Sequence, residues 1–92
     1  MAARELAGVL RRLSLLPRFF FDVHSDGHVF SDDVGVECAG TEDACREATR
    51  ALAEIARDAL PRSGPSELSI EVRDATRRPL MRAVLTFDLV PL

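Results

Sequence analysis

Two histidines and several aspartates gather in one short stretch near the start of the chain, RFFFDVHSDGHVFSDD. His24, His28, Asp22 and Asp26 are residue types that bind zinc and other divalent metals. However, the Asp-Gly pair between two β-rich runs predicts a two-residue hairpin turn. In that register the side chains of His24 and His28 lie on opposite faces of the sheet, so they cannot hold one ion. We therefore expect no metal site, and His24, Asp22 and His28 remain only weak metal candidates.

The remaining reactive side chains do not form a catalytic pattern. Adjacent carboxylates at Asp32 and Asp33 suggest acid–base chemistry, but neighbouring residues of a strand diverge, and an aspartate before a glycine turn usually bonds to the turn itself. Cys38 and Cys45 have no histidine placed near them and lack the spacing of a zinc site. We expect no catalytic residue and no cofactor. We also expect part-buried thiols in a reducing cytosol, although pairing of the two cysteines stays open.

Length and composition are those of one globular domain: 92 residues, 47% apolar and 29% charged. The net charge of −3 is unevenly placed. Residues 1–18 hold four arginines and one glutamate, whereas the remainder holds eight arginines and fourteen acids. An acidic body argues against binding to phosphate backbones. No apolar run approaches the ~18 residues that cross a bilayer. We expect a cytoplasmic protein with neither a nucleic-acid nor a membrane partner.

The aromatic stretch and its return predict a first hairpin. Alternation places Phe19, Phe21 and Val23 toward a core and Phe20 on the other face. A two-residue turn sets Val23 opposite Phe30. The DDVG sequence that follows predicts a bend or bulge before the strand resumes at residue 36.

A long helix and a second hairpin follow. Helical spacing of small and apolar residues runs from Thr41, the expected N-cap, to about Pro61. Alternation over 67–72 and 80–90 predicts two strands with Val72 opposite Met81 and Leu89 still facing inward. Because the first and last strands are the most apolar, we expect them at the centre. The fold class is α+β: a four-stranded, mainly antiparallel sheet in ββαββ order over residues 17–92, with one helix on one face.

The first sixteen residues predict a separate amphipathic helix. Its apolar residues recur at helical spacing and form one stripe: Leu6, Val9, Leu10, Leu13 and Leu16. A helix this short is marginal in water unless the stripe docks on something. The alternative is an unstructured extension that precedes the domain.

Four segments carry a resemblance to a known family: PRFFFDVHSDG, DDVGVE, ACREATRALAEIARDALP and LSIEVRDATRRPLMRAVLTFDL. They resemble a family of small bacterial proteins known only as a domain of unknown function, over residues 17–90. The resemblance implies the ββαββ order and carries no activity. Two features depart from the family: residues 1–16 are extra, and Arg77 stands where the second hairpin of the family usually has a turn glycine.

The sequence favours binding over catalysis. One helix covers one face of the sheet, so the other face, with Phe20 and Val84 at its apolar centre, is open. We expect a non-enzymatic interaction or regulatory module that forms a homodimer, or that holds another protein. The candidate interaction surface is Leu6, Leu10, Leu13, Phe20 and Val84. A small-ligand or metal-binding protein is the alternative, and an enzyme of unknown type is the second.

Overall fold

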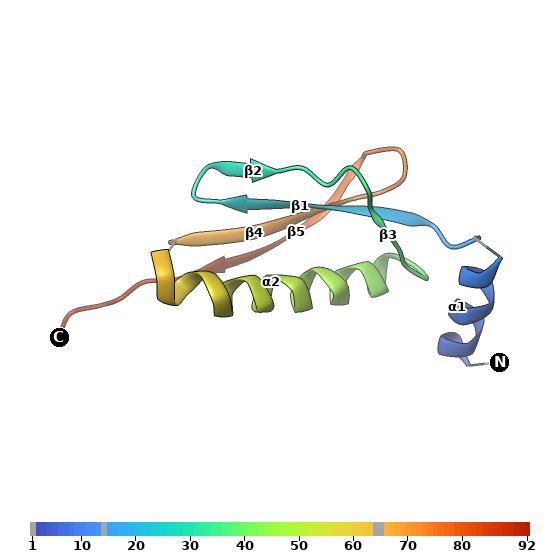
Figure 1. Ribbon diagram of the computed structural model, residues 1–92, viewed down its shortest axis with the longest axis horizontal. Helices are drawn as coiled ribbons and strands as arrows, with labels where there is room; N and C mark the ends of the chain where they lie inside the picture. Colours follow the sequence, from blue (N-terminus) through green and yellow to red (C-terminus); the bar gives the residue numbers. More distant parts are fainter. Residues whose placement is uncertain (1, 14, 64–65) are drawn as a thin grey trace.

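A computed structural model describes residues 2–13, 15–63 and 66–92 of the chain. The elements follow in this order: α1 (Ala3–Arg12), β1 (Arg18–Ser25), β2 (His28–Phe30), β3 (Val36–Glu37), α2 (Thr41–Ser63), β4 (Glu67–Arg73) and β5 (Pro79–Thr86). The strands form an antiparallel sheet in the order β2-β1-β4-β5, and β3 also pairs with β1. Figure 1 shows the sheet with α2 along one side. The predicted α+β class and element order are confirmed.

The first hairpin has the predicted register. Val23 lies opposite Phe30 and Ser25 opposite His28. The two turn residues, Asp26 and Gly27, have φ angles of 45° and 89°. Positive φ at both positions is the geometry of the tight turn that matches the twist of a hairpin.

The return strand is broken, as predicted, between β2 and β3. Residues 31–35 leave the ladder, and Val36 then pairs with Phe19. Gly35 has a φ of 77°. A Cβ at this position would lie 2.8 Å from Arg18 Cγ and 2.9 Å from the Phe19 carbonyl oxygen. Glycine is therefore required both by its conformation and by the close approach of β1.

The second hairpin also has the predicted pairs, with Val72 opposite Met81 and Glu71 opposite Arg82. A bulge at Val72/Arg73 shifts the register near the turn, where Arg73 pairs with Pro79. Arg77 has a φ of 70°, a left-handed conformation that favours glycine. The backbone geometry thus explains why a glycine is expected at this position.

The expected strand order is wrong in one respect. The strand at the centre beside β1 is β4, and the last strand, β5, lies at the edge. The three inward residues of β4, Leu68, Ile70 and Val72, are at most 1% exposed. β5 ends at Thr86, and Leu89 beyond it is 80% exposed rather than inward. The β4 side chains are closed in by β1, β5 and α2 together, which overall hydrophobicity of a strand does not reveal.

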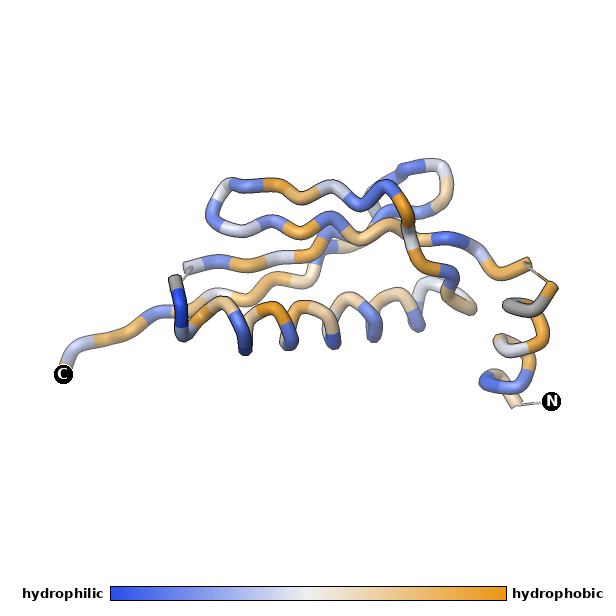
Figure 2. The backbone as a smooth tube through the Cα atoms, in the orientation of Figure 1, coloured by the Kyte–Doolittle hydropathy of each residue, from blue (hydrophilic) through white to orange (hydrophobic). Residues whose placement is uncertain are grey.

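The long helix lies over β4 and β5. Its buried face consists mainly of small residues, Ala44, Ala48 and Ala56, with Leu52. Small side chains let the helix axis approach the sheet closely. Figure 2 shows the apolar side of α2 turned toward the sheet and the polar side turned away. The Ala44 amide donates to the Gly40 carbonyl, so Gly40 rather than Thr41 holds the N-cap position.

Phe20 and Phe21 lie on the predicted faces of β1, but their burial differs from the expectation. Phe20, predicted on the open face, is only 8% exposed, whereas Phe21, predicted in the core, is half-buried. The guanidinium of Arg77 lies over the Phe20 ring, 4.3 Å from its centroid. The β4–β5 turn therefore covers Phe20 from the face opposite α2. On the helix face, α2 lies over β4 and β5 and leaves Phe21 partly uncovered.

Helix α1 stands apart from the sheet, as Figure 1 shows at one end of the molecule. The radius of gyration is 15.4 Å and the longest extent is 54 Å. A compact chain of this length has a radius of gyration of about 12 Å. The predicted N-terminal helix is present, but it ends at Arg12, so that Leu13 and Leu16 lie beyond it; Leu13 is exposed and Leu16 is buried at 6% exposure. Leu6, Val9 and Leu10 are carried on the projecting helix.

Candidate functional site

The two histidines are placed as their register predicts. His24 pairs with Val29 and His28 with Ser25, so the two rings occupy opposite faces of the β1–β2 hairpin. His24 Nε2 lies 3.5 Å from Glu71 Oε2, and the same oxygen accepts from Arg82 Nη2 at 3.0 Å. His24 therefore lies beside the Glu71–Arg82 ion pair on the sheet face opposite α2.

Asp22, the third metal candidate, is engaged in a buried ion pair. It is 6% exposed. Its Oδ2 lies 2.8 Å from Arg73 Nε, and its Oδ1 accepts from Arg73 Nη2 at 3.1 Å. Oδ1 also accepts from the Asp32 amide at 2.9 Å. These contacts satisfy the carboxylate and fasten the broken strand to β1, which is a structural role.

Asp32 replaces the missing ladder bonds where the return strand is broken. Its carboxylate accepts from the amides of Phe21, Val34 and Gly35 at 2.9–3.1 Å. Burial raises the pKa of this carboxyl, but the amides of Gly35, Phe21 and Val34 together outweigh burial and hold its pKa below the usual value. Its neighbour Asp33 is exposed. The adjacent carboxylates therefore have separate environments and form no acid–base pair.

Asp26 has a similar role at the other end of the sheet. Its carboxylate accepts from Ser66 Oγ at 2.8 Å and from the amides of Ser66 and Glu67 at 3.1 and 3.0 Å. The Ser66 hydroxyl bond, followed by the Glu67 amide, lowers the pKa of Asp26. The carboxylate joins the β1–β2 turn to the start of β4, a role that the sequence reading missed because its partners lie forty residues away.

The described part of the chain contains no group of three or more histidine, cysteine, aspartate or glutamate side chains arranged to hold a metal ion. Cys38 Sγ lies 3.9 Å from the Val36 carbonyl oxygen, and Cys45 Sγ lies against Met81 Sδ. The two cysteines are not joined in a disulfide. Both are part of the packing between α2 and the strands.

A serine opposite a histidine is the arrangement closest to a nucleophile and its base. Ser69 pairs with His24 across β1 and β4, and Glu71 lies beside His24. However, Ser69 is 1% exposed. A substrate cannot reach a hydroxyl buried to this extent, so the arrangement lacks the access that nucleophilic catalysis needs.

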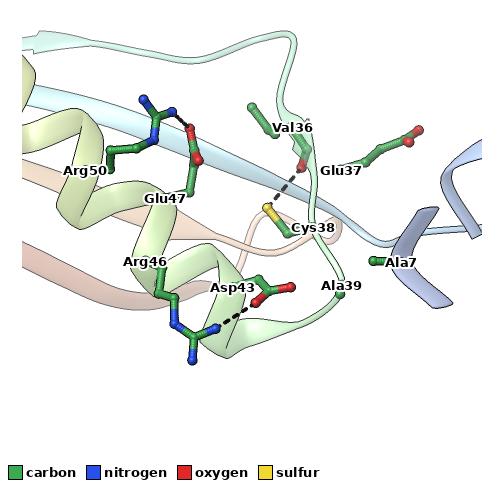
Figure 3. A pocket seen from close by; sticks show the side chains of 9 residues that line it. All are labelled: Ala7, Val36, Glu37, Cys38, Ala39, Asp43, Arg46, Glu47 and Arg50. Atoms are coloured by element: carbon green, nitrogen blue, oxygen red, sulfur yellow. Dashed lines mark hydrogen bonds and ion pairs between the residues drawn. The ribbon is translucent and has the colours of Figure 1, made fainter. Parts of the chain in front are cut away.

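A shallow pocket of about 320 Å³ lies where α1, β3 and α2 meet (Figure 3). Val36, Cys38 and Ala39 line one side, Ala7 lines another, and α2 supplies charged residues. These charges already pair with each other: Arg46 with Asp43, and Arg50 with Glu47. The pocket offers small apolar walls and neutralised charges, and its position at the base of α1 suits packing of a helix better than recognition of a small ion.

A family model described as Domain of unknown function (DUF6894) matches residues 18–86. The chain belongs to this family. The match covers the whole sheet and α2, and it begins at the first residue of β1. Helix α1 lies outside the DUF6894 match. Comparison with curated proteins and with solved structures gives no match.

Within this DUF6894 chain, the predicted interaction residues fall in three separate places. Leu6 (46% exposed) and Leu10 (half-buried) lie on α1, and Leu13 (60% exposed) directly follows its last residue. Val84 is 54% exposed on β5, opposite Ser69. Phe20 lies beneath Arg77 at the other end of β1. Phe20 therefore offers little surface, and the leucines of α1 are the largest apolar group among the predicted residues.

A further apolar surface of the DUF6894 domain was not found from the sequence. Beyond the edge of α2, the helix face of the sheet carries Phe21 and Val23, which are half-buried, and Phe30 and Val36, which are 62% and 43% exposed. The pairs Val23–Phe30 and Phe19–Val36 place these side chains on one face. We call these four residues the uncovered β1–β2 surface.

The described residues contain no helix long and apolar enough to cross a membrane.

Proposed function

We propose that this protein is a non-enzymatic interaction module that forms a homodimer through α1. The observation that carries the proposal is the orientation of α1. A second pocket lies between α1 and the start of α2. On its α1 side it is lined by Ala3, Arg4, Ala7 and Gly8. The leucine stripe lies on the other side of the helix, with Leu6 and Leu13 exposed. The helix thus meets its own body through small and polar residues and presents its apolar side outward.

Burial of this stripe would provide the driving force. A ten-residue helix is marginal when it stands alone in water. Each leucine side chain that becomes fully buried contributes about 1.5–3 kcal/mol. Leu6, Leu10 and Leu13 together would supply several kcal/mol, enough to stabilise both the helix and an association. The basic N-terminal segment and the acidic body of a second copy attract each other, which favours encounter.

The other function classes have less to support them. Asp22, Asp26 and Asp32 are occupied by bonds that hold turns and strands together. A small-ligand or metal-binding protein, and an enzyme, would need such groups turned toward an open site. The proposal keeps the cytoplasm as the compartment, where reducing conditions would preserve the contact of the Cys45 thiol with Met81.

Sedimentation of the full chain and of a chain that starts at Pro17 tests this proposal. The full chain should be a dimer at micromolar concentration, and the shortened chain should be a monomer of lower thermal stability. Gly8→Ala is a matched control, because its added Cβ meets nothing within 4 Å and lies away from the leucine stripe; it should remain a dimer. If both chains sediment as monomers with equal thermal stability, the proposal is wrong.

A further inference from the structure

Helix α2 covers only one half of its sheet face. It lies over β4 and β5, and the uncovered β1–β2 surface continues beside it as an apolar extension of the core. We propose that this surface is the docking site for α1 of a second copy of the chain, and that two copies exchange their α1 helices. This inference rests on the proposed dimer and names the surface that accepts α1.

The dimensions of the helix and the surface agree. A ten-residue helix is about 15 Å long. Along β1, the surface runs from the Phe19–Val36 pair to the Val23–Phe30 pair, which is about 13 Å at the rise of a strand. One side is bounded by α2, whose Ala51 and Ile55 are half-buried against the core. A helix lying beside α2 would therefore pack against both the strands and α2, as a second helix does in a two-layer domain.

The charges at the rim favour the same occupant. The flank of α2 that borders this surface carries Glu47, Glu54 and Asp58 with a single Arg50, a net charge of −2. Arg50 pairs with Glu47 and with Glu54, so it is already shared between two acids. Before β1, the segment has Arg4, Arg11 and Arg12 against Glu5, a net charge of +2, whereas Arg18 on β1 pairs with Glu37. An incoming α1 would place its leucines on the strands, and the net positive charge of the segment would be attracted to this acidic rim.

The helix that docks on the uncovered β1–β2 surface comes from a second copy rather than from the same chain. In its own chain, α1 turns Ala7 and Gly8 toward the start of α2 and its leucines outward. Only residues 13–17, with Pro17 at the end, join it to β1. When two copies exchange their α1 helices, each leucine stripe is buried on the uncovered β1–β2 surface of the other copy. This is the closed, two-fold arrangement typical of homodimers.

Two neighbouring residues of β2 provide a matched test. Phe30 and Val29 are 62% and 55% exposed, and they point to opposite faces of the hairpin. Phe30→Ser should raise the dimer dissociation constant at least tenfold, and Val29→Ser should change it less than threefold. Val36 lies on the same face as Phe30, so Val36→Ser should raise the dissociation constant as Phe30→Ser does. This second variant shows that the effect does not come from misfolding of one variant. Dimers of wild-type affinity in both Phe30→Ser and Val36→Ser would overturn the docking site.

Mixing two defective chains separates this inference from the proposed function. A Leu6→Ser/Leu13→Ser chain keeps an intact surface, and a Phe30→Ser chain keeps an intact α1. Each alone should be monomeric, whereas an equimolar mixture should form a heterodimer with one restored contact. If the leucine variant is monomeric, Phe30→Ser is dimeric and the mixture gives no heterodimer, the α1 helices pair with each other: the docking site is wrong and the homodimer stands. A monomeric wild-type chain would overturn both.

Discussion

β4 and β2 pair with opposite edges of β1, and they have opposite surroundings. The inward residues of β4 are at most 1% exposed, whereas every residue of β2 is exposed. Both strands carry apolar side chains on the helix face, Ile70 in β4 and Phe30 in β2. The difference lies in α2, which covers β4 and stops short of β2. Apolar residues on one sheet face can therefore serve folding on one side of β1 and association on the other.

The largest expected effect tests this division directly. Ile70→Ala removes a side chain that is 1% exposed, and such deletions cost about 2–5 kcal/mol of unfolding free energy. Phe30→Ala removes a larger side chain from an exposed position, and the cost to folding should be about 0.5 kcal/mol or less. Urea unfolding at a protein concentration low enough for the chain to be monomeric measures both, because association would add to the apparent stability. Equal costs at the two positions would show that β2 is part of the folding core and that the division is wrong.

A second prediction concerns the bonds that hold the β2 side in place. Asp32→Ala leaves the amides of Phe21, Val34 and Gly35 without their acceptor, which should cost about 1–3 kcal/mol. Hydrogen exchange should accelerate in residues 30–37 and stay unchanged in β4. Acceleration spread evenly over the sheet would contradict a separate role for the two sides.

The carboxylate of Asp32 also makes the unfolding free energy depend on pH. The folded-state pKa of Asp32 lies below its usual value, so its contribution to stability is full above about pH 4 and is lost as the pH falls through the folded pKa. The wild-type chain should therefore lose more unfolding free energy between pH 6 and pH 3 than Asp32→Asn does. Chemical denaturation at both pH values measures the difference, and parallel curves would exclude this role of Asp32.

The smallest expected effect concerns α1 itself. Gly8 lies within the helix, and an added Cβ meets nothing within 4 Å. Replacing a helix-interior glycine by alanine favours the helix by about 0.5–1 kcal/mol. Gly8→Ala should strengthen the dimer two- to fivefold, because a helix that is already formed loses less freedom when it docks. Weaker association would show that Gly8 itself contacts the partner.

Local sequence patterns predicted the local geometry well. Asp26-Gly27 indicated the first turn, and alternation fixed the registers at Val23–Phe30 and Val72–Met81, because a shift by one residue would reverse every side chain. The turn glycine that the family resemblance implies at position 77 corresponds to an observed positive φ. The first turn and the two registers depend on a few neighbouring residues, which is why a single sequence reveals them.

Features that depend on distant residues could not be predicted. Alternation shows which face of a strand is apolar, but it does not show that β4 lies between β1 and β5. Burial of Phe20 depends on Arg77, fifty-seven positions away. The uncovered β1–β2 surface depends on where α2 crosses the sheet. The sequence therefore predicted an open surface around Phe20 and Val84, although Arg77 covers Phe20. It did not predict the uncovered β1–β2 surface around Phe30.

Hydrogen exchange of α1 as a function of protein concentration tests the central claim most directly. The amides of α1 and of β2 should be protected at concentrations where the dimer forms and should exchange rapidly on dilution. The amides of β4 should keep the same protection throughout, because its burial is complete within one chain. Exchange rates of α1 that do not change with concentration would contradict the claim that this helix is held by a second copy.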